Sequence, residues 1–280
     1  MKKDITKAVE KNIEKFYGNK KAVLTFTDPE DLHQMRVAGR TLLSYFFVLA
    51  DEQEAKSPGF RKVRQPLKKA MRALGELRDA DVLLDEVEQR LPGFTPARRG
   101  VIEKWLEQKQ AGRESLRLKL AIELPYNIDK KWKTRADEWA ASRVPKLADK
   151  ERFTGKVLEL RNERDLVFEA ISEYPHPEMS EDDFLNLVHQ GRIAVKRLRY
   201  ALNVEKKFMD IDDGEIEALK TLQDQLGHIQ DMRVWISQLE DFYKDRSVVD
   251  GITAKWRSEM LKTLKETGIQ VQAIEAIHLK

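Results

Sequence analysis

Apolar residues recur at intervals of three and four along most of the chain, which is the spacing of an amphipathic helix. No stretch alternates apolar and polar residues in the manner of a half-buried strand. We therefore predict an all-α protein. Helices are expected over about 5–18, 28–55, 60–90, 96–123, 129–149, 151–173, 181–208, 214–244 and 248–277.

Capping residues and prolines mark several of the expected helix ends. Asp28 followed by Pro29 predicts a helix start, because an acceptor side chain caps the first turn and proline fits its first position. Ser180, with an acid at Asp183, matches a capping box. Breaks between helices are expected at Ser57-Pro58-Gly59, Leu91-Pro92-Gly93 and Pro125-Tyr126-Asn127.

The two halves of the sequence repeat each other. Residues 33–40 (His-Gln-Met-Arg-Val-Ala-Gly-Arg) align with residues 189–196 (His-Gln-Gly-Arg-Ile-Ala-Val-Lys) at an offset of 156. Residues 74–79 (Leu-Gly-Glu-Leu-Arg-Asp) align with residues 226–231 (Leu-Gly-His-Ile-Gln-Asp) at an offset of 152. Ordered matches at nearly one offset indicate a duplication. We predict two homologous bundles of about four helices, over residues 1–150 and 151–280.

Composition narrows the possible functions. Charged residues make up 35% of the 280 residues, yet 51 basic and 48 acidic side chains leave a net charge of only +3. The absence of cysteine excludes a disulfide scaffold, a thiolate zinc site and a cysteine nucleophile. The longest uncharged run, Thr41 to Ala50, is too short to span a membrane, and the N-terminus lacks the apolar core of a signal peptide. We predict a soluble, cytoplasmic protein with no membrane partner.

Basic residues are gathered on helix faces. At 100° per residue, four basic or histidine positions of 189–199 fall on one stripe about 15 Å long, and the repeat places a shorter stripe in 33–40. Like charges one turn apart repel, so a stripe without acids predicts an anionic ligand; arginine presents a fork that matches phosphate oxygens. Two such stripes could form one basic groove or pore. The alternative, that these bases are solvated or pair with acids on neighbouring helices, stays open. The stripes comprise His33, Arg36 and Arg40; Arg61, Arg64, Lys68 and Arg72; and His189, Arg192, Lys196 and Arg199, with Lys220 repeating Lys68.

The repeated histidines and glycines call for a role within this pattern. His33 and His189 have no His, Asp or Glu three or four residues later, so neither begins a two-ligand metal site on its helix. An imidazole that donates to phosphate or orients the neighbouring arginine fits better. We predict no metal site and no cofactor. Glycine is unfavourable inside a helix, so its recurrence at 75 and 227 indicates close packing, and the repeated acids at 79 and 231 are expected to pair with a base of the stripe.

These motifs resemble the CHAD family, the histidine-bearing α-helical domain. The resemblance lies in 189–200, 33–40 and 74–82 and covers about 28–280. It implies two four-helix bundles with pseudo-twofold symmetry, a basic central channel, binding of inorganic polyphosphate and association with polyphosphate granules. Arg197 enters the site on the resemblance alone, because the helix angle places it off the stripe. One departure is Thr41-Leu42-Leu43, which follows Arg40 where the family pattern continues with bases, so the first stripe is shorter. The predicted polyphosphate-binding residues are His33, Arg36, Arg40, Arg61, Arg64, Lys68, Arg72, His189, Arg192, Lys196, Arg197, Arg199 and Lys220.

Three functions compete for this sequence. The leading one is a non-catalytic protein that binds inorganic polyphosphate. Many relatives carry an N-terminal triphosphate-processing domain, but we expect none here because the chain leaves no room for one. The second is a phosphohydrolase or phosphotransfer enzyme that acts on polyphosphate or a phosphorylated metabolite. Hydrolysis usually needs metal-binding carboxylates near the phosphates, which the stripes lack. The third is a nucleic-acid-binding protein, which would favour aromatic residues beside the bases and a broader basic surface.

Overall fold

The computed structural model describes residues 2–173, 180–209 and 211–268 and contains no strand within them. The prediction of an all-helical chain is confirmed. Over the same ranges, no helix combines the length and the apolar character needed to cross a membrane. The helices are α1 Lys2–Val23, α2 Pro29–Leu49, α3 Glu52–Lys56, α4 Pro58–Arg90, α5 Pro96–Asn127, α6 Lys130–Leu147, α7 Lys150–Ser172, α8 Glu181–Glu205, α9 Asp213–Phe242 and α10 Asp250–Glu266, with 3-10 turns η1 Leu91–Gly93 and η2 Arg246–Val248.

The helices form two compact units. The first comprises residues 1–86, 107–156 and 203–211, and the second comprises 87–106, 157–202 and 212–280. Helices α4, α5, α7 and α8 each contribute residues to both units. The units are defined by contacts, whereas the division at residue 150 is inferred from the repeat. That division stays a prediction about the origin of the two halves.

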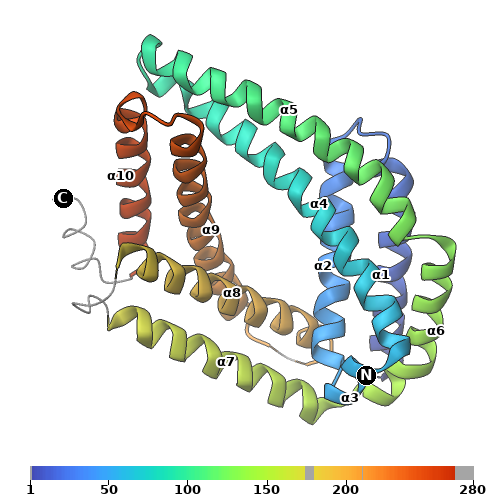
Figure 1. Cartoon of the computed structure of the whole chain (residues 1–280). Helices are drawn as coiled ribbons and strands as arrows, with labels where there is room; N and C mark the ends of the chain where they lie inside the picture. The colour runs from blue at the N-terminus through green and yellow to red at the C-terminus, as the bar shows by residue number, and fades with distance from the viewer. Residues whose placement is uncertain (1, 174–179, 210, 269–280) are drawn as a thin grey trace. The chain divides into compact units, whose positions relative to one another are not determined.

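In the first unit, α1 packs against both α2 and α6 (Figure 1). Ile5, Val9, Ile13 and Phe16 lie on the buried face of α1, at the three- and four-residue spacing of an amphipathic helix. The Phe16 ring meets the edge of Trp132 from α6 at a centroid distance of 5.8 Å. This apolar packing fixes α2, which carries the first basic stripe.

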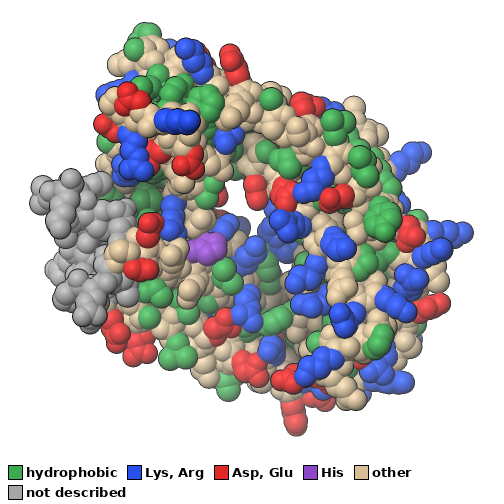
Figure 2. Space-filling view, in the orientation of Figure 1, with side chains coloured by type: hydrophobic (Ala, Val, Ile, Leu, Met, Phe, Trp, Pro, Cys, Tyr) green, Lys and Arg blue, Asp and Glu red, His purple; other side chains and the backbone are tan. Residues whose placement is uncertain are grey.

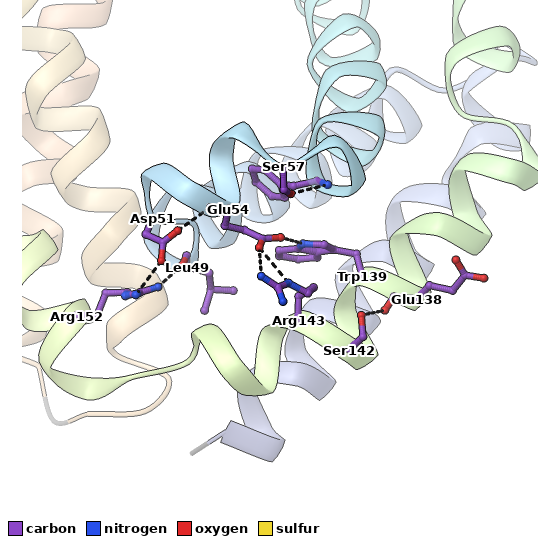
Figure 3. Close-up of polar contacts among 10 residues, drawn as sticks. Leu49, Asp51, Glu54, Ser57, Glu138, Trp139, Ser142, Arg143 and Arg152 are labelled. Carbon is purple, nitrogen blue, oxygen red and sulfur yellow. Dashed lines mark hydrogen bonds and ion pairs between the residues drawn. The ribbon is translucent and has the colours of Figure 1, made fainter.

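The predicted helix over 28–55 ends earlier, at Leu49, and a separate α3 begins at Glu52. Figure 3 shows why: the Asp51 carboxylate caps α3 by accepting from the Glu54 backbone N–H at 2.7 Å. Arg152 donates to the free carbonyl of Leu49 at 3.2 Å and to Asp51 at 3.1 Å. A capping aspartate competes with helix continuation, so the chain turns at Ala50.

The α3 turn is held by a buried carboxylate. Glu54 is almost fully buried and accepts hydrogen bonds from the Trp139 indole at 2.7 Å and from Arg143 Nε at 3.0 Å (Figure 3). Its charge is therefore balanced by a guanidinium, which makes the burial of a carboxylate tolerable. This cluster ties α3 to α6 within the first unit.

In the second unit, α9 and α10 lie side by side (Figure 1) and enclose an aromatic cluster. The Trp256 ring lies 6.1 to 6.4 Å, between centroids, from the rings of Phe94, Trp105 and Trp235. Both units thus bury their tryptophans, including Trp132 and Trp139 of the first. All five tryptophans of the chain are therefore core residues.

Two further helix-end predictions have clear outcomes. The capping box at Ser180 is confirmed: its hydroxyl accepts from the Asp183 backbone N–H, and Asp183 accepts from the Ser180 backbone N–H, both at 3.2 Å. The predicted break at Pro125 is wrong, because α5 continues to Asn127. The Ile128 N–H still donates to Leu124, and burial of both side chains holds the last turn despite the proline. Residues 269–277 of the last predicted helix lie outside the described residues.

Candidate anion-binding site

The first stripe lies on α2, on the side of the helix away from its buried residues. Met35, Ala38 and Leu42 enter the core, whereas His33 is exposed and Arg36 is partly exposed. The burial pattern agrees with the helix angles inferred from the sequence. His33 therefore stands at the surface of the first unit, whereas Arg36 is largely covered.

Arg36 is held against α4 at a glycine. A Cβ atom added to Gly75 would lie 2.9 Å from Arg36 Nη1, so only a residue without a side chain leaves this space for the guanidinium. Arg36 Nη2 also lies 3.9 Å from Asp79 Oδ1, and the Arg36 side chain is only 14% exposed. Asp79 thus lies beside a base of the stripe, as the sequence predicted, and Gly75, predicted to mark close packing, leaves the space that Arg36 occupies.

The basic stripe on α4 has two parts that differ in whether an acidic side chain lies beside them. Arg61, Arg64 and Lys68 form no ion pair within the described part of the chain. Arg72, one turn further along, donates to Glu76 at 2.9 Å, and Lys119 of α5 donates to the same carboxylate at 2.7 Å. Figure 2 shows Lys and Arg side chains gathered over α2 and α4 of this unit. An acid therefore pairs with Arg72, from its own helix and not from a neighbouring one, whereas the start of the stripe has no such pair among the described residues.

These two bases also change the acidity of Glu76. The hydrogen bond from Lys119 is the main cause that lowers the pKa of Glu76, and Arg72 lowers it further against the opposing effect of burial. Glu76 is therefore charged at neutral pH. It neutralises part of the basic surface at this end of α4.

In the second unit, His189 of α8 lies in a positively charged environment. Burial is the largest cause that lowers the pKa of His189, and the positive charge of Arg192 lowers it further. Arg233 and Lys196 act in the same direction, while a side-chain hydrogen bond with Gln230 of α9 opposes them. The imidazole is therefore neutral at pH 7. Its Nδ1 atom is buried and has no hydrogen-bond partner in the described structure.

Arg192 repeats the arrangement of Arg36 with one difference. A Cβ atom added to Gly227 of α9 would lie 3.7 Å from Arg192 Nε, so this guanidinium also lies over a glycine. Among the residues the structure describes, however, Arg192 forms no ion pair, and its buried Nε has no acceptor. The second unit therefore contains a buried N–H donor on a positively charged side chain, and an anionic acceptor would satisfy this donor.

The remaining predicted bases of the second unit differ in their surroundings. Arg197 pairs with Glu163 of α7, which agrees with its helix angle away from the stripe. Arg199 lies over the ring of Tyr200, 5.1 Å from its centroid. Lys220 is 3.5 Å from Glu217 on its own helix. Lys196 acts on His189 through its charge. The structure thus brings His189, Arg192 and Lys196 together and directs Arg197 elsewhere.

Two residues near His189 were not predicted from the sequence. Gln230 bonds to the imidazole, and it stands where the first half of the repeat has Arg78. Arg233 of α9 donates to Asn186 at 2.9 Å and to Asp182 at 3.1 Å, both on α8. The repeat aligns Arg233 with Asp81, so no motif marked it. Only the packing of α9 on α8 places its charge beside the histidine.

The arrangement offers guanidinium and imidazole groups to an anion. Guanidinium forks bind phosphate oxygens in pairs of hydrogen bonds. Over the described ranges, no three His, Asp or Glu side chains come together in a way that could hold a metal ion. Recognition of negative charge is the chemistry for which guanidinium and imidazole groups are suited.

Comparisons with known proteins agree with this picture. The chain matches the CHAD domain family over residues 7–240. It is similar to the crystal structure of the CHAD domain from the plant Ricinus communis, with a TM-score of 0.69 and 22% sequence identity over 100% of this chain and 92% of that one. No curated protein matches it in sequence. Because the family match spans most of the sequence, this chain belongs to the CHAD family.

Proposed function

We propose that this protein binds inorganic polyphosphate without catalysing its turnover. The observation that carries the proposal is the repeated arginine over a glycine: Arg36 over Gly75 and Arg192 over Gly227. A buried N–H donor without a partner, here Arg192 Nε, is costly unless an acceptor completes it. Phosphate oxygens match that donor, and membership of the CHAD family supports polyphosphate as their source.

A linear polymer of phosphates suits the spacing of the bases. Arg36 and Arg40, or Arg192 and Lys196, lie four residues apart, which is about 6 Å along the helix. A chain with a negative charge on every unit can follow the whole length of a stripe, whereas pyrophosphate offers only two phosphates. Two pseudo-symmetric four-helix bundles around a basic groove, the finer form of the fold prediction, belong to this proposal.

Nucleic acid is a weaker candidate for the ligand. Recognition of single strands relies on aromatic side chains that stack with bases. All five tryptophans are buried in the cores of the units, so none offers a stacking surface. The exposed lysine and arginine side chains bind the phosphates of any polyanion, so they do not single out nucleic acid.

The proposal excludes a phosphohydrolase or phosphotransfer activity and places the protein in the cytoplasm, on polyphosphate granules. Calorimetric titration of the full chain with long polyphosphate, pyrophosphate and single-stranded DNA, at equal phosphate and salt concentrations, tests the ligand. Incubation with polyphosphate and magnesium or manganese, followed by an assay for released phosphate, tests the absence of turnover. A fluorescent fusion of the full chain tests its location.

We expect long polyphosphate to bind far more tightly than pyrophosphate and more tightly than DNA. Equal affinity for polyphosphate and pyrophosphate would contradict an extended site. Equal affinity for DNA would show a general polyanion binder. Sustained phosphate release that is lost in His189→Gln would show an enzyme.

A further inference from the structure

An exposed apolar stripe runs along the C-terminal half of α5, on the first unit. Leu118 and Ile122 are 70% and 73% exposed, and Tyr126 beside them is 83% exposed. Monomeric proteins rarely leave several large apolar side chains together on one helix face, and such patches commonly mark binding surfaces. No part of the polyphosphate proposal uses these residues.

The stripe has the spacing of a coiled-coil seam. Leu118 and Ile122 belong to a line of five residues, from Ala111 to Pro125, that follow one another at alternating steps of four and three residues. All five residues are uncharged and exposed. That spacing keeps one line of side chains facing a second helix. The line is about 21 Å long from the helical rise. We call this line the α5 seam; it consists of Ala111, Ser115, Leu118, Ile122 and Pro125.

We propose that the α5 seam is the contact surface for a second copy of this chain, packed parallel and in register. In a parallel pair, each uncharged seam residue meets its own counterpart, so the surface is complementary to itself. Because α5 is already held by its buried face, through Leu120 and Leu124, pairing costs no folding of the helix.

Charges beside the seam favour this occupant and this orientation. Glu114 lies on one flank and Lys119 on the other, five residues later, which is the separation of interhelical salt bridges in parallel pairs. Two-fold symmetry would form this bridge twice. An antiparallel partner would instead bring the two Lys119 side chains near each other.

The existing partners of these two charges leave room for the new contact. Glu114 accepts from Arg113 and Arg117, and its side chain remains half exposed. Lys119 donates to Glu76 through one hydrogen, while an ammonium group has three. Both groups can therefore keep their partners within the chain and bind across the interface.

Sedimentation equilibrium of the full chain tests the proposal. We expect concentration-dependent dimers, and we expect Leu118→Glu with Ile122→Glu to weaken self-association by at least about tenfold. Leu158→Glu with Leu166→Glu is the matched control, because both leucines are exposed on α7 but belong to no continuous seam. Circular dichroism checks that each variant remains helical.

The absence of cysteine from the sequence allows a second, direct measurement. Single variants Ala111→Cys and Leu118→Cys, oxidised separately, should each form disulfide-linked dimers, because a parallel pair aligns every seam residue with its counterpart. A monomer across micromolar concentrations, or equal weakening by the α7 control pair, would overturn the proposal. Crosslinking at only one of the two positions would overturn the parallel orientation.

Discussion

Arg36 in the first unit and Arg192 in the second occupy equivalent positions of the repeat, and each guanidinium lies against a glycine of a neighbouring helix. Their charge environments differ. Arg36 has a carboxylate, Asp79, 3.9 Å away, whereas Arg192 has an unpartnered buried Nε and the neutral imidazole of His189 nearby. The two halves of the repeat share the space for an arginine, but they differ in the charged groups around it.

The position after the glycine shows the same contrast. In the first unit it is Glu76, which takes up part of the positive charge of Arg72 and Lys119. In the second it is His228, whose Nε2 lies 3.3 Å from Glu259 of α10. If the protein binds polyphosphate as proposed, an acid beside the stripe in one unit and a histidine in the other lead us to expect a larger contribution from the second unit.

The largest expected effect follows from this asymmetry. Arg192→Ala with Lys196→Ala should weaken polyphosphate binding roughly a hundredfold, because each charged hydrogen bond contributes about 1.5–3 kcal/mol. The slope of log affinity against log salt concentration reports the number of phosphate contacts in nucleic-acid complexes. By analogy, the number derived from this slope should fall by about two. Arg36→Ala with Arg40→Ala should act in the same direction but less. Calorimetric titrations at several salt concentrations measure both.

A suitable control pair lies on α6. Lys130 and Lys131 are exposed and form no ion pair within the described ranges, whereas Lys133 bonds Glu14 at 3.0 Å and Asp137 at 2.7 Å. Lys130→Ala with Lys131→Ala should leave the affinity nearly unchanged. If this control weakens binding as much as the Arg192 pair, or if the Arg36 pair matters more, the asymmetry between the units is wrong.

The second prediction separates stability from binding. Glu54→Ala should lower the free energy of unfolding by about 2 kcal/mol, because it leaves the buried Trp139 indole without an acceptor. In the second unit, Glu215→Ala should cost less than about 1 kcal/mol, since its pair with Arg161 is partly exposed. Thermal unfolding measures both. Neither variant should change polyphosphate affinity, and a parallel loss of affinity would mean that global stability governs binding.

The third prediction concerns pH. The lowered pKa of His189 means that the folded protein binds fewer protons than the unfolded chain just below the ordinary histidine value of about 6.5. Stability should therefore fall as the pH drops through that value. Bound phosphate should raise the pKa of His189, so polyphosphate affinity should rise severalfold between pH 7.5 and 6.0.

His189→Gln should flatten the pH dependence of stability and the pH dependence of polyphosphate binding. His228→Gln, in the same unit, should change neither the pH dependence of binding nor the affinity. Urea unfolding and calorimetric titration across this range measure the two effects. A pH dependence of binding that survives in His189→Gln would place the titrating group elsewhere.

The smallest expected effects distinguish the two glycines. A Cβ at Gly227 would meet Arg192 at ordinary contact distance, so Gly227→Ala should stabilise the fold by up to about 1 kcal/mol without changing binding. A Cβ at Gly75 would come too close to Arg36, so Gly75→Ala should stabilise less and weaken binding a few-fold. Thermal unfolding and titration of both variants check this; identical behaviour would mean that the glycines do not position the arginines.

Much of the fold and part of the candidate site could be predicted from the sequence. The spacing of apolar residues predicts the helices, and the repeat predicts close packing at Gly75 and a base beside Asp79, because both patterns can be read directly from the sequence. The turn at Ala50 could not be predicted, since Arg152 binds the Leu49 carbonyl from a hundred residues away. Nor could the roles of Gln230 and Arg233, which depend on how α9 packs on α8.

The five histidines of the chain provide the most direct test of polyphosphate binding at the repeated motif. In nuclear magnetic resonance spectra of histidine-labelled protein, we expect long polyphosphate to shift the imidazole signals of His33 and His189. The signals of His176, His228 and His278 should change little, and the His189 signal should move toward its protonated position. Unchanged spectra at saturating polyphosphate, or equal shifts of all five histidines, would contradict the account.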